Sequence, residues 1–397
     1  MTTGTANAAG EGVVIAGGGL AAQRCAETLR RLGYEGRVRM VCAEPHLPYD
    51  RPPLSKAVLG DPAAEDSVGF RPAEWYPNKA IEALRGIAAS GLDPAAHRLA
   101  LGDGSAVHYE QLVIATGAKP RTLPAFAGYE NVSTLRTLED SRCLRAAMVP
   151  GDRLLVIGAG FIGQEAAAAA CKAGVHTTII ETAPAPLAAL LGAELGGWFA
   201  DLHRASGVEL LLSEQVEGVH GDRRVESVTL RSGKIVACDH VLVGVGIEPS
   251  LDWLRGSALA EGIVRTDVDG RSEVPGVYAA GDAAALFDPL LGRHVLGSHW
   301  ETAGRQGARA AKAMLGLDPG PAGVSSFWSD LYGTRVQYLG HAPLADGLSF
   351  DGDPRSRDFM ATFTTAGRPV AVLLAGRPQM LPHARALLTT SNERNQG

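Results

Sequence analysis

The sequence predicts an α/β fold that contains two copies of one unit, in which an apolar strand is followed by a glycine-rich turn and a helix. The first copy has the apolar run Val13–Ala16 and the turn Gly17–Ala22. The second copy has the run Leu154–Ile157, the turn Gly158–Gly163 and an alanine-rich helix over Gln164–Ala173. One such turn also occurs as a plain connection, but two in tandem predict two Rossmann-like domains that bind two dinucleotides.

The first copy has the features of a pyrophosphate site. Its glycines let the backbone turn tightly, and the N-terminus of the following helix favours a negative charge. The next expected strand, Val38–Ala43, ends in Glu44, whose carboxylate is placed to accept hydrogen bonds from an adenosine ribose. Ala22 stands where the fingerprint accepts either glycine or alanine.

The second copy also ends its next strand, Thr177–Ile180, in a carboxylate, Glu181. A carboxylate at this place binds a free ribose 2′-hydroxyl and repels a 2′-phosphate. No Arg or Lys follows Glu181 until Arg204. The second site is therefore predicted to bind NADH rather than NADPH.

Composition agrees with a globular enzyme of two or three domains. The chain has 397 residues, 46% hydrophobic and 20% charged, with a net charge of -6. The negative charge argues against nucleic-acid binding. No apolar run approaches the roughly 18 residues of a membrane helix, and the first twelve residues do not resemble a signal peptide. We expect a cytoplasmic monomer or weak dimer that binds neither membrane nor nucleic acid.

The five cysteines, Cys25, Cys42, Cys143, Cys171 and Cys238, form no C-x-x-C pair and no ligand-like cluster. The sequence therefore predicts no redox-active disulfide, no metal site and no bound iron–sulfur cluster. Buried, inert thiols are expected instead.

The second copy is expected to interrupt the domain that carries the first. The strand Gln111–Ala115 ends in Thr116-Gly117, and a second crossing over 241–246 ends in Gly246. The chain then returns through a strand that runs into Gly281-Asp282 and a helix. The predicted boundaries are 1–118 and 244–320 for the first domain and 119–243 for the inserted domain.

A last α+β domain, 321–397, is predicted to follow the linker Leu317–Gly323. Strands are expected over 335–340, 359–363 and 369–374, and an exposed loop over Asp351–Arg357.

The motifs taken in order resemble a known family. They are GGGLAA, RPPLSK, ATGAKPR, LRTLED, GAGFIGQE, AAGD, HWE and FWSD, and they extend from about Val13 to about Gly340. This order is similar to that of the NADH-dependent ferredoxin and rubredoxin reductases that serve cytochromes P450 and ring-hydroxylating dioxygenases. The resemblance implies a glutathione reductase type of fold, non-covalent FAD in the first domain, NADH in the inserted domain and a C-terminal domain that helps to form a docking surface.

The resemblance also implies site residues by position. The pyrophosphate of FAD would meet Gly17, Gly19, Leu20 and Ala21, and the rest of FAD would meet Glu44, Arg51, Lys56, Ala89, Ala115, Thr116, Gly117, Arg136, Gly281, Asp282, Trp300 and Trp328. NADH would meet Gly158, Gly160, Phe161, Ile162, Gly163, Glu181 and Gly246. Lys56 and Glu165 are the candidate catalytic residues, expected to pair close to flavin N5. A cation at that edge favours the anionic reduced ring and raises its reduction potential.

The activity that the resemblance implies is electron transfer from NADH through FAD to a [2Fe-2S] ferredoxin, in preference to a rubredoxin. Because such ferredoxins are acidic, a basic docking surface is expected, with Arg305, Arg309, Lys312 and Arg335 as candidates.

Two alternatives stay open on the sequence alone. One is an NADH-dependent reductase of a small oxidant, similar to monodehydroascorbate reductase or NADH oxidase. The other is a redox-sensing FAD protein that resembles apoptosis-inducing factor. Cys42 lies inside a predicted strand, which is the wrong place for a peroxide-reducing cysteine.

Overall fold

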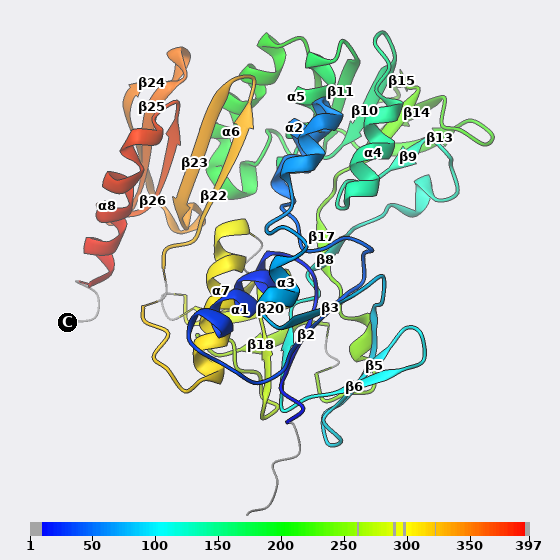
Figure 1. The fold of residues 1–397 in the computed structure, drawn as a ribbon. Helices are drawn as coiled ribbons and strands as arrows, with labels where there is room; N and C mark the ends of the chain where they lie inside the picture. Colours follow the sequence, from blue (N-terminus) through cyan, green and yellow to red (C-terminus); the bar gives the residue numbers. More distant parts are fainter. Residues whose placement is uncertain (1–9, 260–261, 289–290, 297–298, 322, 394–397) are drawn as a thin grey trace, which may run out of the picture. The chain divides into compact units, whose positions relative to one another are not determined.

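The protein divides into two compact units in the computed structural model, which describes residues 10–259, 262–288, 291–296, 299–321 and 323–393 (Figure 1). The first unit comprises Met1–Asp50, Val68–Lys119 and Pro249–Gly323, and the second comprises Arg51–Ser67, Pro120–Glu248 and Val324–Gly397. The chain passes from the first unit to the second through β8 (Ala118–Pro120) and returns through β17 (Ile247–Pro249). The domain boundaries expected from the sequence remain a prediction.

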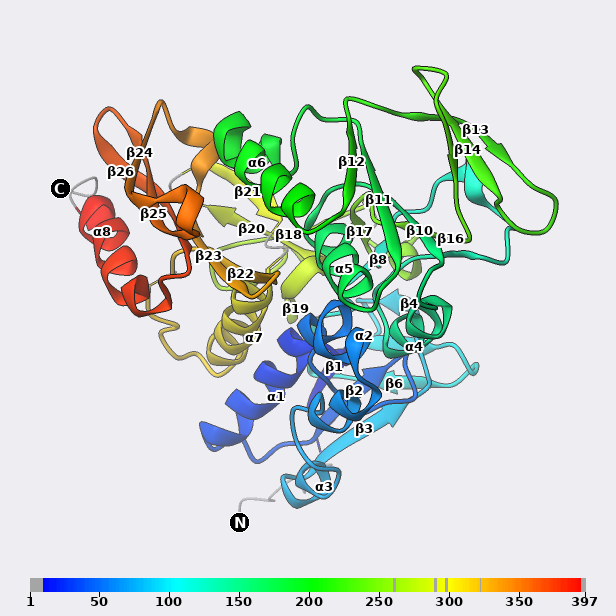
Figure 2. The ribbon, with the colours of Figure 1, turned by 90° about the horizontal axis from the view of Figure 1, so that it is seen from above.

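A parallel sheet of five strands lies at the centre of the first unit, in the order β19-β7-β1-β2-β3. Alternate side chains of β1 point to opposite faces, as in any strand. Ile15 belongs to the core that packs against α1 and α7, and Val14 belongs to the core formed with β5 and with Leu251, Leu254 and Leu259. Figure 2 shows α1 and α7 side by side. The elements are β1 (Val13–Ala16), α1 (Leu20–Arg31), β2 (Val38–Cys42), β3 (Ile81–Arg85), β7 (Gln111–Ile114), β19 (Val277–Ala279) and α7 (Trp300–Met314).

Two smaller sheets complete the first unit, β4-β5-β6 and β18-β20-β21. The strands of these two sheets are β4 (Ala89–Asp93), β5 (Arg98–Leu101), β6 (Ala106–His108), β18 (Val264–Thr266), β20 (Ala284–Asp288) and β21 (Arg293–Leu296). The unit also contains the short helix α3 (Trp75–Asn78). The helix expected after Gly281-Asp282 is wrong, because a single 3₁₀ turn over Gly281–Ala283 leads directly into β20.

The second unit repeats the pattern with a parallel sheet in the order β12-β11-β10-β16-β9. Its strands β10 and β16 are nearly continuous apolar runs, which is typical of a sheet that is covered on both faces. The elements are β9 (Val132–Ser133), α4 (Leu138–Ala147), β10 (Arg153–Ile157), α5 (Phe161–Lys172), β11 (His176–Glu181), α6 (Ala188–Ala205), β12 (Glu209–Leu212) and β16 (His240–Val243). A separate antiparallel sheet is formed by β13 (Val216–His220), β14 (Ser227–Leu230) and β15 (Ile235–Ala237).

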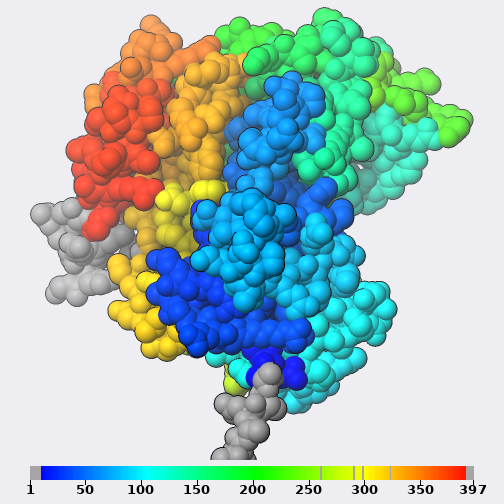
Figure 3. Space-filling view, in the orientation of Figure 1, coloured from blue at the N-terminus to red at the C-terminus, as the bar shows by residue number. Residues whose placement is uncertain are grey.

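The short segment Arg51–Ser67 belongs to the second unit although the chain on either side of it belongs to the first. It carries a 3₁₀ turn over Pro52–Ser55 and α2 (Ala57–Gly60), which packs against α4 and α5. Leu59 is fully buried in the core that includes side chains of β10, β11 and β16. Figure 3 shows this blue segment against the teal and green surface of the second unit.

The C-terminal part of the second unit is an antiparallel sheet in the order β22-β23-β26-β25-β24, with α8 packed against β26. The three strands expected from the sequence are confirmed. The exposed loop expected over 351–357 is wrong in its first half, because Asp351–Asp353 ends β24 and pairs with β25. This edge strand alternates weakly in polarity, so the sequence pattern did not indicate it. The elements are β22 (Ser326–Leu331), β23 (Thr334–Gly340), β24 (Gly347–Asp353), β25 (Asp358–Thr365), β26 (Arg368–Ala375) and α8 (Leu381–Glu393).

None of the helices in the described part of the chain has the length and apolar character needed to cross a membrane.

Candidate functional site

The glycine turn of the first unit lies where several parallel strands end together. Ala16 of β1 is in register with Val41 of β2 and Ile114 of β7, and Ile114 is in register with Ala279 of β19. The segments that follow these strands carry Gly17–Ala21, Glu44, Ala115–Gly117 and Gly281-Asp282. The structure therefore brings these predicted residues to one edge of one sheet, which is where open α/β sheets bind ligands.

The first glycine turn fits a pyrophosphate. Gly17 has φ +143°, and a Cβ there would lie 2.0 Å from the carbonyl oxygen of Ala115, so only glycine is accommodated. A Cβ at Gly19 would meet nothing within 4 Å, so this glycine faces open space. Gly19 is the N-cap of α1 and, within the described residues, no side chain caps the helix or places an acid in its first turn. The amides at the start of α1 are thus available to a phosphate.

Residues that the sequence did not single out support this edge. Tyr49 donates its hydroxyl to Glu44 Oε2 at 2.5 Å, and Thr116 Oγ1 donates to the carbonyl oxygen of Ser250 at 2.9 Å. The buried Gln306 of α7 accepts a 2.7 Å hydrogen bond from the amide of Gly281. Gly307 is required because a Cβ there would lie 2.0 Å from the carbonyl oxygen of Ala21. The sequence signal for Gly307 was a glycine inside a helix, which often marks close packing.

The second glycine turn has the corresponding geometry within the second unit. Gly158 has φ +101°, and a Cβ at Gly163 would lie 2.2 Å from the carbonyl oxygen of Gly158. Glu181 ends β11 beside the turn, where its Oε2 accepts from the amide of Ala159 at 2.7 Å and its Oε1 from the amide of Ala183 at 2.8 Å. Gly246, with φ +104°, accepts a hydrogen bond from the amide of Arg121. The Glu181 carboxylate is an acceptor, which fits a dinucleotide whose ribose carries free hydroxyls.

Two predicted residues start the helix that follows this turn. Phe161 packs its ring edge-on against Phe327 of β22, with 4.4 Å between the ring centroids. Ile162 is exposed in the first turn of α5.

Lys56 and Glu165 form the expected pair inside the second unit. Lys56 Nζ lies 2.7 Å from Glu165 Oε1, and the two side chains are 17% and 4% exposed. The carboxylate also accepts from Ser55 Oγ at 2.5 Å and from Ser329 Oγ at 2.7 Å. A buried ion pair is tolerable when further hydrogen bonds satisfy its oxygens, which is the case here. The pairing is present in the structure, and its place beside a flavin remains a prediction.

The remaining predicted flavin residues are distributed over both units. In the second unit Arg51 donates to the carbonyl oxygen of Arg136 at 2.7 Å. In the first unit Trp300, the first residue of α7, donates its indole N–H to Asp50 Oδ1 at 2.5 Å. Trp328 lies in β22 with the guanidinium of Arg335 over its ring, and Ala89 starts β4.

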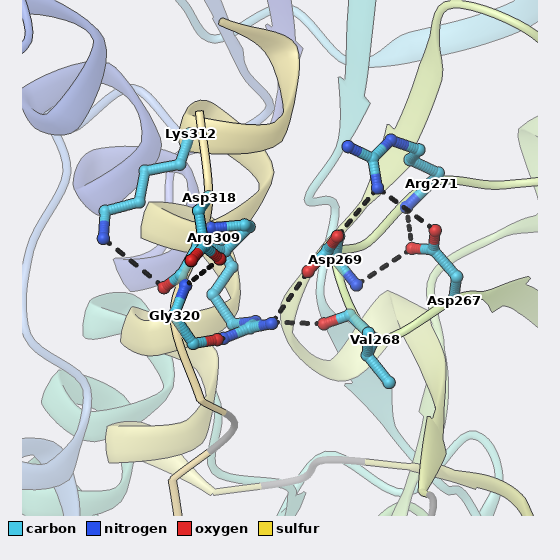
Figure 4. Close-up of polar contacts among 9 residues, drawn as sticks. Asp267, Val268, Asp269, Arg271, Arg309, Lys312, Asp318 and Gly320 are labelled. Atoms are coloured by element: carbon cyan, nitrogen blue, oxygen red, sulfur yellow. Dashed lines mark hydrogen bonds and ion pairs between the residues drawn. The ribbon is translucent and has the colours of Figure 1, made fainter. Parts of the chain in front are cut away.

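The structure does not support Arg309 as a docking residue (Figure 4). Its guanidinium pairs with Asp269 at 2.7 Å and donates to the carbonyl oxygens of Val268 and Gly320, with the side chain only 13% exposed. Lys312 donates to the carbonyl oxygen of Pro319. Helical spacing placed these side chains on one face correctly, but that face packs against loops of its own unit.

The cysteines differ in their burial. All five are free thiols, and no group of three or more metal-ligating side chains occurs among the described residues. Burial raises the pKa of Cys42 to about 12, so this thiol stays protonated. The expectation of buried thiols is wrong for Cys143, which is exposed, and only partly right for Cys171.

Comparison with known proteins places these sites in a family. Residues 11–307 match the family described as pyridine nucleotide-disulphide oxidoreductase, and residues 326–396 match the family described as reductase C-terminal. The ferredoxin reductase component of chlorobenzene dioxygenase from Cupriavidus sp. (strain PS12) is 39% identical over 83% of this chain and 80% of its own length. Putidaredoxin reductase from Pseudomonas putida is 32% identical over 96% of this chain and 92% of its own.

A solved structure agrees with the sequence relatives. The covalent complex of putidaredoxin reductase and putidaredoxin matches with a TM-score of 0.91 and 30% identity, covering 96% of this chain and 93% of that chain. The chain therefore belongs to the pyridine nucleotide-disulphide oxidoreductase family, within the ferredoxin reductases of that family, and is an oxidoreductase that uses FAD with NADH as the electron donor.

Proposed function

We propose that this protein passes electrons from NADH through FAD to a [2Fe-2S] ferredoxin that serves a cytochrome P450 or a ring-hydroxylating oxygenase. The observation that carries the proposal is the near full-length likeness to a reductase seen in complex with putidaredoxin. Relatives that are components of dioxygenase systems support it at 36% to 39% identity. The absence of an accessible thiol at Cys42 speaks against the peroxide-reducing alternative.

The chemistry of the bound cofactor explains why such a protein is needed. Bound FAD accepts a hydride as two electrons together and can release them one at a time to a carrier that accepts only one. The chain contributes binding and orientation. The amides at the start of α1 and of α5 would hold the two pyrophosphates, and the carboxylates of Glu44 and Glu181 would accept from ribose hydroxyls.

We further propose the full set of site residues expected from the sequence, with Lys56 as the cation that contacts the flavin and Glu165 as the residue that holds it. The two serine hydroxyls hold the Glu165 carboxylate, and that carboxylate together with the carbonyl oxygen of Pro52 holds the ammonium group of Lys56. The positive charge therefore acts at one place rather than averaging over a mobile side chain. The predicted domain boundaries at 118, 243 and 320 are part of the same proposal. Because NADH is an intracellular reductant and the five cysteines are free thiols, we propose a cytoplasmic location.

The function is tested by titrating purified [2Fe-2S] ferredoxins into an NADH-driven cytochrome c assay. We expect a rate that depends on the ferredoxin, saturates with it and is much smaller with NADPH. A protein that NADH bleaches rapidly but that no ferredoxin reoxidises faster than oxygen does would contradict the proposal. Rubredoxin serves as the control carrier.

A further inference from the structure

The buried residue Gln164 holds the second glycine turn from the side opposite to Glu181. Gln164 is 1% exposed, and its amide nitrogen donates to the carbonyl oxygen of Ala159 at 2.9 Å. The amide of the same Ala159 donates to Glu181. The backbone N–H and C=O of Ala159, inside the glycine turn, are therefore both bound by side chains.

Gln164 is in turn held by a histidine. His203 of α6 is fully buried, and its Nε2 lies 3.0 Å from Gln164 Oε1. Because Gln164 uses its nitrogen as the donor to Ala159, its oxygen must accept, and Nε2 of His203 must carry the hydrogen. Nδ1 is then an acceptor, and Tyr332 lies 2.7 Å from it with its hydroxyl. The hydrogen bonds run in one direction, from Tyr332 through His203 and Gln164 to Ala159.

The tyrosine at the start of this chain occupies a backbone position that disfavours it. Tyr332 and Gly333 form the two-residue loop between β22 and β23, with φ of +51° and +78°. A hairpin loop with both residues at positive φ prefers Asn-Gly or Gly-Gly. A strained residue that persists in a structure is a reason to look for a role, and the hydroxyl of Tyr332 has one in this chain of hydrogen bonds.

A second link joins the same two regions. Ser329 of β22 donates to Glu165, the residue after Gln164, so adjacent buried residues of α5 both depend on the β22–β23 hairpin. We propose that Gln164, His203 and Tyr332 are positioning residues of the NADH site, through which the C-terminal hairpin fixes the orientation of the glycine turn. This inference rests on the assignment of NADH to that turn.

The test uses the FAD-containing full chain and needs no ferredoxin. Tyr332→Phe removes one hydroxyl and leaves the ring in place. We expect a dissociation constant for NAD⁺, measured by calorimetry, that is about fivefold higher, which corresponds to about 1 kcal/mol for one buried hydrogen bond. The KM for NADH in ferricyanide reduction should rise by the same factor, while kcat changes less than twofold. Gln164→Glu places an oxygen against the carbonyl oxygen of Ala159 and should weaken binding at least tenfold.

Tyr338→Phe is the matched control. Tyr338 lies in the same sheet, is 2% exposed, and accepts a 2.6 Å hydrogen bond from the amide of Ala342, outside this chain of hydrogen bonds. If Tyr332→Phe changes NAD⁺ affinity no more than Tyr338→Phe does, the inference is wrong. A wild-type protein that binds NAD⁺ and takes electrons from NADH but reduces no ferredoxin would overturn the proposed function and leave this inference standing.

Discussion

At the scale of single residues, the site is defined by carboxylates whose environments differ. Glu181 accepts hydrogen bonds from two backbone amides at the end of a strand, whereas the charge of the buried Glu165 is neutralised by Lys56. The carboxylate of Glu181 can exchange its backbone amide donors for ribose hydroxyls, because both kinds of donor are neutral. The arrangement at Glu165 suits a fixed charge pair, because moving either partner would leave a buried charge alone.

The Lys56–Glu165 pair can be separated into its structural and chemical roles by a double-mutant cycle. Lys56→Met leaves the buried carboxylate uncompensated and should lower the free energy of unfolding by about 3 kcal/mol. Adding Glu165→Gln should restore most of that loss, because the charge that needed a partner is gone. Urea unfolding of the FAD-bound variants measures this. Loss of visible flavin absorption after mixing with NADH should be slow in both variants, and a double variant that recovers the wild-type rate would disprove a catalytic role for Lys56.

His203 should make stability depend on pH in a defined window. Burial lowers its pKa from 6.5 to about 4, so the unfolded chain binds this proton at a higher pH than the folded protein does. The free energy of unfolding should therefore fall as the pH drops from 6.5 towards 4, by up to roughly 3 kcal/mol from this residue. The His203→Gln variant lacks this titrating group. The difference in the free energy of unfolding between the wild type and this variant should therefore become smaller as the pH falls. Parallel pH profiles in urea unfolding would contradict this.

At the scale of elements, Arg309 of α7 joins two loops of the first unit, the turn at 267–270 and the linker that follows the helix. The guanidinium binds Asp269 and two carbonyl oxygens, one on each of two loops (Figure 4). The same helix accepts a hydrogen bond from the amide of Gly281 through Gln306. Contacts at Gln306 and at Arg309 therefore hold α7 at two places. Arg309 and Lys312 of this helix are therefore engaged with loops of their own unit.

Arg309→Ala should destabilise the protein by about 3 kcal/mol, because it leaves Asp269 and the two carbonyl oxygens without this donor. Arg305→Ala is the comparison, since its ion pair with Glu301 is longer, at 3.7 Å, and more exposed. That substitution should cost less than about 1 kcal/mol. Thermal unfolding of the two FAD-bound variants measures the difference, and equal melting temperatures would show that the Arg309 contacts contribute little.

The sequence predicted the elements that have a strong local signal. Both glycine turns, the strands beside them and the acidic residues at Glu44 and Glu181 follow from patterns of a few residues. The helix after Asp282 was wrong because a glycine turn after a strand is compatible with either a helix or another strand. The edge strand β24 was missed because its exposed residues lack apolar alternation.

At the scale of the whole molecule, partners far apart in the sequence escaped prediction for a physical reason. Ser329 and Glu165 are 164 positions apart, and Tyr332 and His203 are 129 apart. No local periodicity encodes such pairs, because only the folded topology makes them neighbours. The Lys56–Glu165 pair, by contrast, was expected from the family resemblance and is present.

Removal of the flavin should lower the melting temperature of the whole protein. A ligand that binds only the folded state stabilises it by RT ln(1 + [L]/Kd), so the melting temperature of the stripped protein should rise with added FAD and continue to rise above saturation. NAD⁺ should add a smaller increment and NADP⁺ almost none, because Glu181 disfavours a 2′-phosphate. Differential scanning calorimetry at several ligand concentrations checks this, and equal effects of NAD⁺ and NADP⁺ would exclude that role for Glu181.

The segment Arg51–Ser67 has a consequence for anyone who wishes to exchange modules between relatives of this protein. A graft that carries only 120–248 would set Glu165 and the core around Leu59 against the recipient's own segment in place of 51–67. Since the second unit is assembled from stretches that are not contiguous in the sequence, an exchange that keeps these native contacts must include 51–67. Recombination at a single pair of crossover points would therefore separate Lys56 and Leu59 from the residues that they contact in this chain.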